Sequence, residues 1–219
     1  YTELADGTGL GSTLTSIDTI TASLRGQLGE AVESIKKDSV PLPQVSTQNL
    51  DALRAFALGQ AAYGKGDFKQ AMQFYERAVA LDPHFALAWL GLVRIHYSRV
   101  DGASAIAPLR KAQAERGRLA PREAMYLDAW SARFDDPSTA TAKWLELARL
   151  YPDYGAAQSN ASMWLSIDNR FKDSLVFAQA AIAPQNVDIG IDYDSIGRAE
   201  LVMGRYRQAA RSFDLAVAN

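Results

Sequence analysis

Apolar residues recur along the chain at steps of three and four, the spacing of one face of an α-helix. Two such patterns flank a short polar segment at residues 66–71, which reads GDFKQA. The first pattern covers residues 52–65 and the second covers residues 72–83. This stretch therefore predicts a helix, a turn and a second helix.

The same arrangement recurs along the chain. GRYRQA at 204–209 and NRFKDS at 169–174 resemble the first turn segment, and DGASA at 101–105 and DPSTA at 136–140 are weaker forms. Each lies between two helical patterns, and the period is about 34 residues, typical of helix–turn–helix repeats. We expect an array over residues 50–219 with five units, at 52–85, 86–120, 121–154, 155–189 and 190–219.

Turn residues mark the ends of these helices. Gly66 and Gly204 suit the left-handed conformation that ends a first helix, and Asp67 suits the N-cap of the helix that follows. We expect Pro83 and Pro152, like Pro121, to occupy the first helical position of the next unit, where the missing N–H costs nothing.

The residues expected to pack between paired helices also repeat. Small residues come early in each second helix: Ala71, Ala105, Ala140, Ser174 and Ala209. A small side chain on one helix that faces a large side chain on the other lets the two helices approach closely. In the third unit Asp128 stands where a small residue is expected, so either the helix register differs there or Asp128 has a local partner.

Residues 1–49 differ from the array. Leu14, Ile17, Ile20, Leu24, Leu28, Val32 and Ile35 predict an amphipathic helix, preceded by a turn-rich loop and followed by an extended linker with Pro41 and Pro43. Because the terminal units of a repeat array need a cover, we expect this helix to cap the first unit.

The motif LG…GDF…A…Y…A…DP of the first unit, with IG…GRY…A…F…A of the fifth, resembles the tetratricopeptide repeat (TPR) family. The resemblance implies an all-α, right-handed superhelical solenoid whose first helices line a concave face. TPR proteins bind extended peptides or helices on that face.

The junction LRGQLGEAVESI…PLPQVSTQNLDALRAFALG is similar to the segment ahead of the TPR region in bacterial multidomain signalling proteins. The peptide modification system cyclases are the nearest group, beside TPR-containing kinases and winged-helix regulators. Any catalytic domain would then lie outside this chain. A start at Tyr1 and an end before the proline that closes a unit fit a piece of a longer protein.

Composition narrows the chemistry. The net charge of −2 argues against duplex DNA or an anionic membrane as a partner. With no cysteine and two histidines, we expect no bound metal and no cofactor. No phosphate loop or hydrolase motif occurs, so we expect no enzymatic activity. No apolar stretch is long enough for a transmembrane helix.

The first helices carry a second stripe that we expect to face the groove. It comprises Phe56, Gln60, Tyr63, Leu90, Arg94, Tyr97, Met125, Arg133, Met163, Asp194 and Arg198. Aromatic, methionine and arginine residues suit a partly acidic peptide.

We therefore expect a non-catalytic interaction or sensor module that binds a peptide segment. Self-association through the ends of the array is the alternative, and a single-stranded nucleic-acid binder is a third, which the charge disfavours. The sequence fits the cytoplasm or the periplasm, with the periplasmic part of a membrane-anchored protein favoured.

Overall fold

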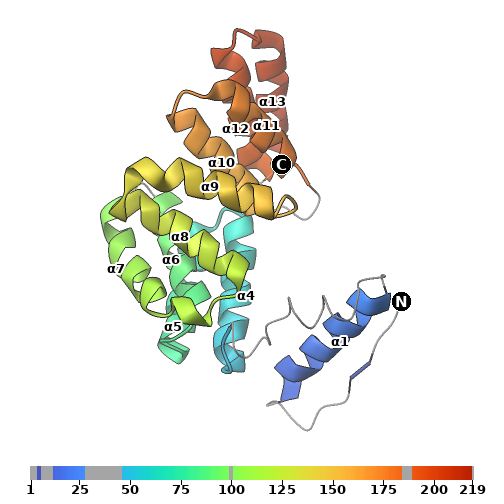
Figure 1. Ribbon diagram of the computed structural model, residues 1–219, viewed down its shortest axis with the longest axis vertical. Helices are drawn as coiled ribbons and strands as arrows, with labels where there is room; N and C mark the ends of the chain where they lie inside the picture. The colour runs from blue at the N-terminus through green and yellow to red at the C-terminus, as the bar shows by residue number, and fades with distance from the viewer. Residues whose placement is uncertain (1–3, 6–11, 28–45, 99–100, 184–188, 219) are drawn as a thin grey trace. The chain divides into compact units, whose positions relative to one another are not determined.

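The computed structural model describes residues 4–5, 12–27, 46–98, 101–183 and 189–218, and all regular structure in these ranges is helical (Figure 1). The chain divides into two compact units, residues 1–121 and 122–219, which we describe separately. The expected boundary at residue 49/50 is a different division, because it separates the leading segment from the repeats.

The described part of unit 1 contains two helical hairpins after α1 (Thr13–Gln27). The first pairs α4 (Leu50–Gly64) with α5 (Phe68–Leu81), and the second pairs α6 (Ala86–Ser98) with α7 (Gly102–Ala114). A short 3₁₀ turn, Arg116–Arg118, follows α7. The core of this unit is built mainly from alanines and aromatic rings of α4, α5, α6 and the turn before α6, among them the fully buried Tyr75 and Phe85.

Unit 2 contains three hairpins. They pair α8 (Pro121–Asp135) with α9 (Ala140–Leu150), α10 (Gly155–Ile167) with α11 (Phe171–Ala181), and α12 (Ile189–Val202) with α13 (Tyr206–Ala218). In the first hairpin the rings of Tyr126, Trp130 and Trp144 meet edge to face, with centroids 5.2–6.4 Å apart. The all-α repeat fold that the sequence predicted is therefore confirmed.

The predicted turn chemistry is partly right. Gly66 and Gly204 have φ of 73° and 75°, and Asn169 takes the same role with φ of 60°. The Asp67 carboxylate accepts a hydrogen bond from the Gln70 N–H at 3.0 Å, so it caps α5 as expected.

The expectation for Pro83 and Pro152 is wrong, because both lie in turns that precede their helices. Asp82 explains the first case. Its carboxylate accepts from the His84 N–H at 2.9 Å and its carbonyl from the Phe85 N–H at 3.1 Å, so a turn forms and α6 begins only at Ala86. Pro121 does begin α8, as expected.

The small residues expected at the helix contacts are buried: Ala71, Ala105, Ala140, Ser174 and Ala209 are at most 1% exposed. Residues at the contacts between paired helices must be small because the two helices lie close together. A Cβ atom at Gly59 would lie 2.6 Å from the ring of Tyr75, and one at Gly197 would lie 2.6 Å from the ring of Phe213. At the third unit α8 runs through Asp128 without a break, and Asp128 is half-buried with a partner of its own.

The residues just before α4 are fixed to the turn between α5 and α6. Buried Thr47 donates a hydrogen bond to the Asp82 carboxylate at 2.6 Å, and the Asn49 side-chain amide donates to the Leu81 carbonyl at 3.1 Å. The Asn49 side chain also caps α4. Before this segment, α1 covers Thr13–Gln27, and the rest of the predicted helix and its linker lie outside the described residues. The capping role of this helix stays a prediction.

Candidate functional site

A cluster of polar and aromatic side chains lies where α4 and α6 run side by side in unit 1. The Arg94 guanidinium on α6 stands 4.1 Å above the ring centroid of Tyr63 on α4, and its Nη1 is 3.4 Å from the Gln60 side-chain oxygen. The Tyr63 hydroxyl is 3.2 Å from the Ser98 hydroxyl. We call Gln60, Tyr63, Arg94, Tyr97 and Ser98 the Arg94 surface.

The repeat explains why these residues meet. Gln60 and Arg94 are 34 residues apart, and Tyr63 and Ser98 are 35 apart, so they occupy equal or adjacent positions in successive first helices. Gln60 also accepts a hydrogen bond from the Tyr75 hydroxyl, which joins the Arg94 surface to the core. The cation above an aromatic ring is stabilised by the charge distribution of the ring.

Of two residues expected in the groove, Leu90 is buried and Phe56 packs at the edge of the core. Leu90 is 3% exposed, so it packs inside the protein and offers no surface to a partner. Phe56 is half-buried, and its ring contacts those of Tyr75 and Phe85 at centroid distances of 5.8 and 5.1 Å. The Leu90 side chain therefore packs in the core and the Phe56 side chain packs at its edge.

The expected groove residues of unit 2 are more dispersed. Exposed Arg133 on α8 lies 5.6 Å from the ring centroid of Trp164 on α10, which repeats the arginine–aromatic pairing of unit 1. Met125 and Met163 are half-buried. Asp194 accepts a hydrogen bond from Arg198 at 2.6 Å within α12, so these two charges neutralise each other.

A third cation–ring contact, between Arg122 and Tyr154, was not predicted from the sequence. The Arg122 guanidinium lies 4.5 Å from the ring centroid of Tyr154 and forms an ion pair with Glu123 at 2.7 Å. Burial by itself lowers the pKa of Arg122, but attraction and a hydrogen bond from Glu123 outweigh it and raise the pKa above its ordinary value. Tyr154 lies in the turn before α10, where no helical periodicity indicates its direction.

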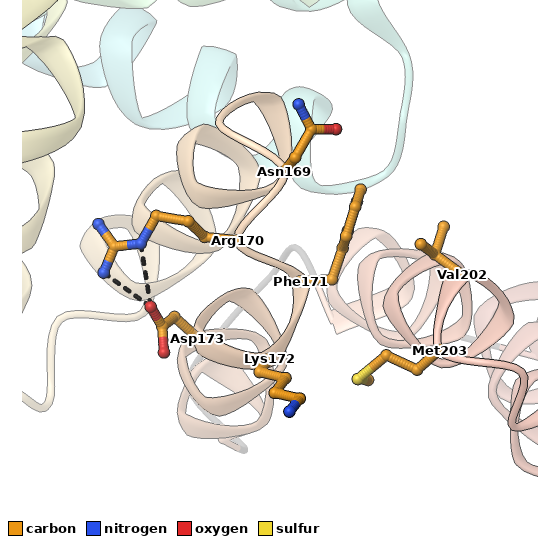
Figure 2. Close-up of a pocket in the computed structure, with 7 residues that line it drawn as sticks. All are labelled: Asn169, Arg170, Phe171, Lys172, Asp173, Val202 and Met203. Atoms are coloured by element: carbon orange, nitrogen blue, oxygen red, sulfur yellow. Dashed lines mark hydrogen bonds and ion pairs between the residues drawn. The ribbon is translucent and has the colours of Figure 1, made fainter.

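A shallow pocket of about 430 Å³ lies in unit 2 between the α10–α11 turn and the end of α12. Figure 2 shows the ring of Phe171 between the Arg170–Asp173 pair and the side chains of Val202 and Met203. Arg170 donates two hydrogen bonds to Asp173, at 2.7 and 3.0 Å. The sequence analysis assigned these residues to a turn and missed the hollow beside it.

The described residues contain no group of three or more histidine, cysteine or acidic side chains placed to hold a metal ion. None of the described helices combines the length and the apolar character needed to cross a membrane.

Comparison with known proteins identifies one of the repeats. Residues 52–85 match the tetratricopeptide repeat model, and these are the residues of the first predicted unit. None of the curated protein sequences compared with the chain matches it.

Three solved structures are similar in fold. The Cut9–Hcn1 complex of the APC/C has a TM-score of 0.56 and 13% identity, and the match covers 95% of this chain and 44% of that chain. The TPR protein TTC0263 from Thermus thermophilus has a TM-score of 0.53 and 18% identity, with 76% of this chain and 90% of that chain covered. The type IV pilus biogenesis factor PilW has a TM-score of 0.52 and 19% identity, with 77% of this chain and 78% of that chain covered. Residues 52–85 are thus a match to the tetratricopeptide repeat, and the chain has the all-α repeat fold of TPR proteins.

Proposed function

We propose that this chain is a protein–protein interaction module and that the Arg94 surface binds a peptide segment of a partner. The observation that supports this is the gathering of Gln60, Tyr63 and Arg94 from two successive first helices onto one surface. A guanidinium held above a ring and beside an amide is preorganised, which reduces the entropy cost of binding.

The chemistry of the surface suits a segment with an acidic side chain. Arg94 offers a cation whose fork of N–H groups matches a carboxylate. Tyr63 and Tyr97 offer half-buried rings with polar tips, the residue type that anchors many interfaces. We propose Met125, Arg133 and Met163 separately as partner contacts of unit 2, while Arg198 would have to exchange Asp194 for a partner carboxylate.

Binding can be tested with defined peptides. A random peptide display library is selected on the wild-type chain, and the enriched peptides are synthesised and titrated by fluorescence polarisation. We expect Arg94→Glu to weaken binding by about tenfold or more, equivalent to about 1.4 kcal/mol. Arg77→Glu on α5 is the matched control, because it makes the same change of charge at an exposed position outside the surface.

The control should bind within about twofold of the wild type, since exposed positions outside an interface contribute little. Melting curves of both variants verify the fold. Equal binding by folded Arg94→Glu and wild type would place the peptide site elsewhere on the chain and reject the Arg94 surface.

We also propose that this module serves a larger bacterial signalling protein, which the resemblance of the junction at residues 24–59 supports. The full-length open reading frame tests this directly. A catalytic or DNA-binding domain in the same reading frame would support the proposal, and a reading frame that encodes only the repeats would reject it.

A further inference from the structure

Inside unit 1, one stripe of α5 is covered by the next first helix, α6. The stripe comprises Phe68, Met72, Tyr75 and Val79, of which Tyr75 is 0% and Val79 9% exposed. A Cβ atom at Gly59 of α4 or at Gly91 of α6 would lie 2.6 or 2.8 Å from the Tyr75 ring. The ring therefore fills the space between its own first helix and the next one.

The same stripe on α13 is left uncovered by the described residues. It comprises Tyr206, Ala210, Phe213 and Val217, of which Tyr206 is 70% and Val217 91% exposed. Phe213 occupies the position of Tyr75 and contacts Gly197 of its own first helix, where a Cβ atom would lie 2.6 Å away. Its other side is where a further first helix would pack.

The opposite deficiency occurs on α4. The face that α6 turns toward α5 comprises Ala88, Gly91, Leu92 and Ile95, and all four are buried. The residues one repeat earlier on α4 are Arg54, Ala57, Leu58 and Ala61, and all four are exposed, Leu58 to 46%. Among the residues that the structure describes, α4 thus has no preceding second helix of the kind that α6 has in α5.

We propose that α13 of one copy packs against α4 of a second copy in the way that α5 packs against α6. The uncovered α13 stripe requires a first helix with a small residue opposite the Phe213 ring, and Ala57 stands at the position of Gly91. Because alanine adds a methyl group, the two helices lie slightly farther apart than α5 and α6. Such a head-to-tail contact joins different surfaces, so it extends into rings or filaments rather than stopping at a symmetric dimer.

Sedimentation velocity over a range of concentrations measures this association. We expect the average mass of the wild-type chain to rise above the 23.9 kDa of one copy as concentration increases. Leu58→Asp on α4 and Val217→Asp on α13 should each prevent that rise. A mixture of the two variants should form two-chain complexes, because each still carries the face that the other has lost.

Val176→Asp on α11 is the matched control, since Val176 is 62% exposed and lies on neither face. It should associate like the wild type. The proposal is overturned if the wild type keeps the mass of one copy at every concentration, as it would if the leading segment covered α4. It is also overturned if Leu58→Asp associates normally, which would indicate contacts between two α13 helices, or if the mixture stays monomeric.

A second measurement does not depend on the acidic variants being stable. α5 and α6 are joined by a short turn and run antiparallel, so α13 and α4 should also run antiparallel in the proposed contact. Ala210, one turn before Phe213, should then lie near Ala61, one turn after Ala57. The chain has no cysteine, so Ala61→Cys and Ala210→Cys each carry a single thiol. Oxidation of the mixture should yield mainly the mixed disulfide dimer, and a random distribution of dimers would reject the contact.

Discussion

The ring of Tyr75 lies between two glycines, Gly59 on α4 and Gly91 on α6, and its hydroxyl donates to Gln60. The side chain is completely buried, so its ring cannot move into solvent to make room. Three helices therefore depend on the size of one ring and on the absence of two Cβ atoms.

Gly59→Ala should destabilise unit 1 by about 1–3 kcal/mol, the usual cost of overpacking a core contact. The new Cβ would lie 2.6 Å from the Tyr75 ring, and this clash outweighs the gain in helix propensity that alanine normally brings. The change would be measured as the free energy of unfolding in urea, followed by circular dichroism.

Gly102→Ala is the control for that experiment. Gly102 begins α7, and a Cβ atom added there would have nothing within 4 Å, so the substitution should be neutral or stabilising by up to about 1 kcal/mol. A Gly59→Ala protein as stable as the control would show that Tyr75 can repack at little cost.

Residues whose role depends on local backbone chemistry could be predicted from the sequence. Gly66, Gly204 and Asp67 have the conformation or the capping bond that their types and positions indicated. Pro83 was mispredicted because a proline fits both a helix start and a turn. The choice was made by Asp82, whose side chain is held by Thr47 from 35 residues earlier.

At the scale of the element, the α10–α11 hairpin replaces a close apolar contact with hydroxyl groups. Ser174 stands where the other second helices have alanine, and its Oγ lies 3.0 Å from that of Ser162 and 2.7 Å from that of Ser166. Ser162 and Ser174 are both 0% exposed. Each hydroxyl therefore depends on its neighbours for hydrogen bonding.

Ser162→Ala should cost about 0.5–1.5 kcal/mol, because it removes one of the two hydroxyl partners of buried Ser174 and leaves Ser166 as the other. The double variant Ser162→Ala/Ser174→Ala should cost less than the sum of the two single variants, since a buried pair replaced by two methyl groups leaves less polar surface unsatisfied. A double-mutant cycle of unfolding free energies measures the difference. Strict additivity would mean that the two hydroxyls do not interact.

The wrong prediction that Leu90 lines the groove also arises from how whole helices pack. The spacing of apolar residues identifies the face that a helix turns toward its partner, but it does not show how many neighbours the helix has. Seven residues of α6 are buried, against four of α4. An interior first helix contacts a preceding hairpin as well as its own partner, so less of its circumference is left for a binding surface.

For the whole molecule, the balance of charge bears on the kind of partner. The 23 basic and 25 acidic residues give a net charge of −2, and binding to nucleic acid depends on an excess of cations that displaces counterions. We expect a labelled single-stranded oligonucleotide to show no saturable binding at about 0.15 M salt, measured by fluorescence anisotropy. Saturable binding that weakens steeply with added salt would contradict this expectation and revive the nucleic-acid alternative.

The bond between Thr47 and Asp82 also bears on the order in which the parts of the chain fold during synthesis. That bond and those linking α4 to α6 span only 34–35 residues, so contacts of this kind can close soon after their second partner is synthesised. Domains commonly fold from the amino terminus during synthesis. A chain interrupted after α7 would already contain both glycines that flank Tyr75 and all the partners described here for Asp82. The amino-terminal unit can therefore fold on the ribosome while the remaining hairpins are still being translated.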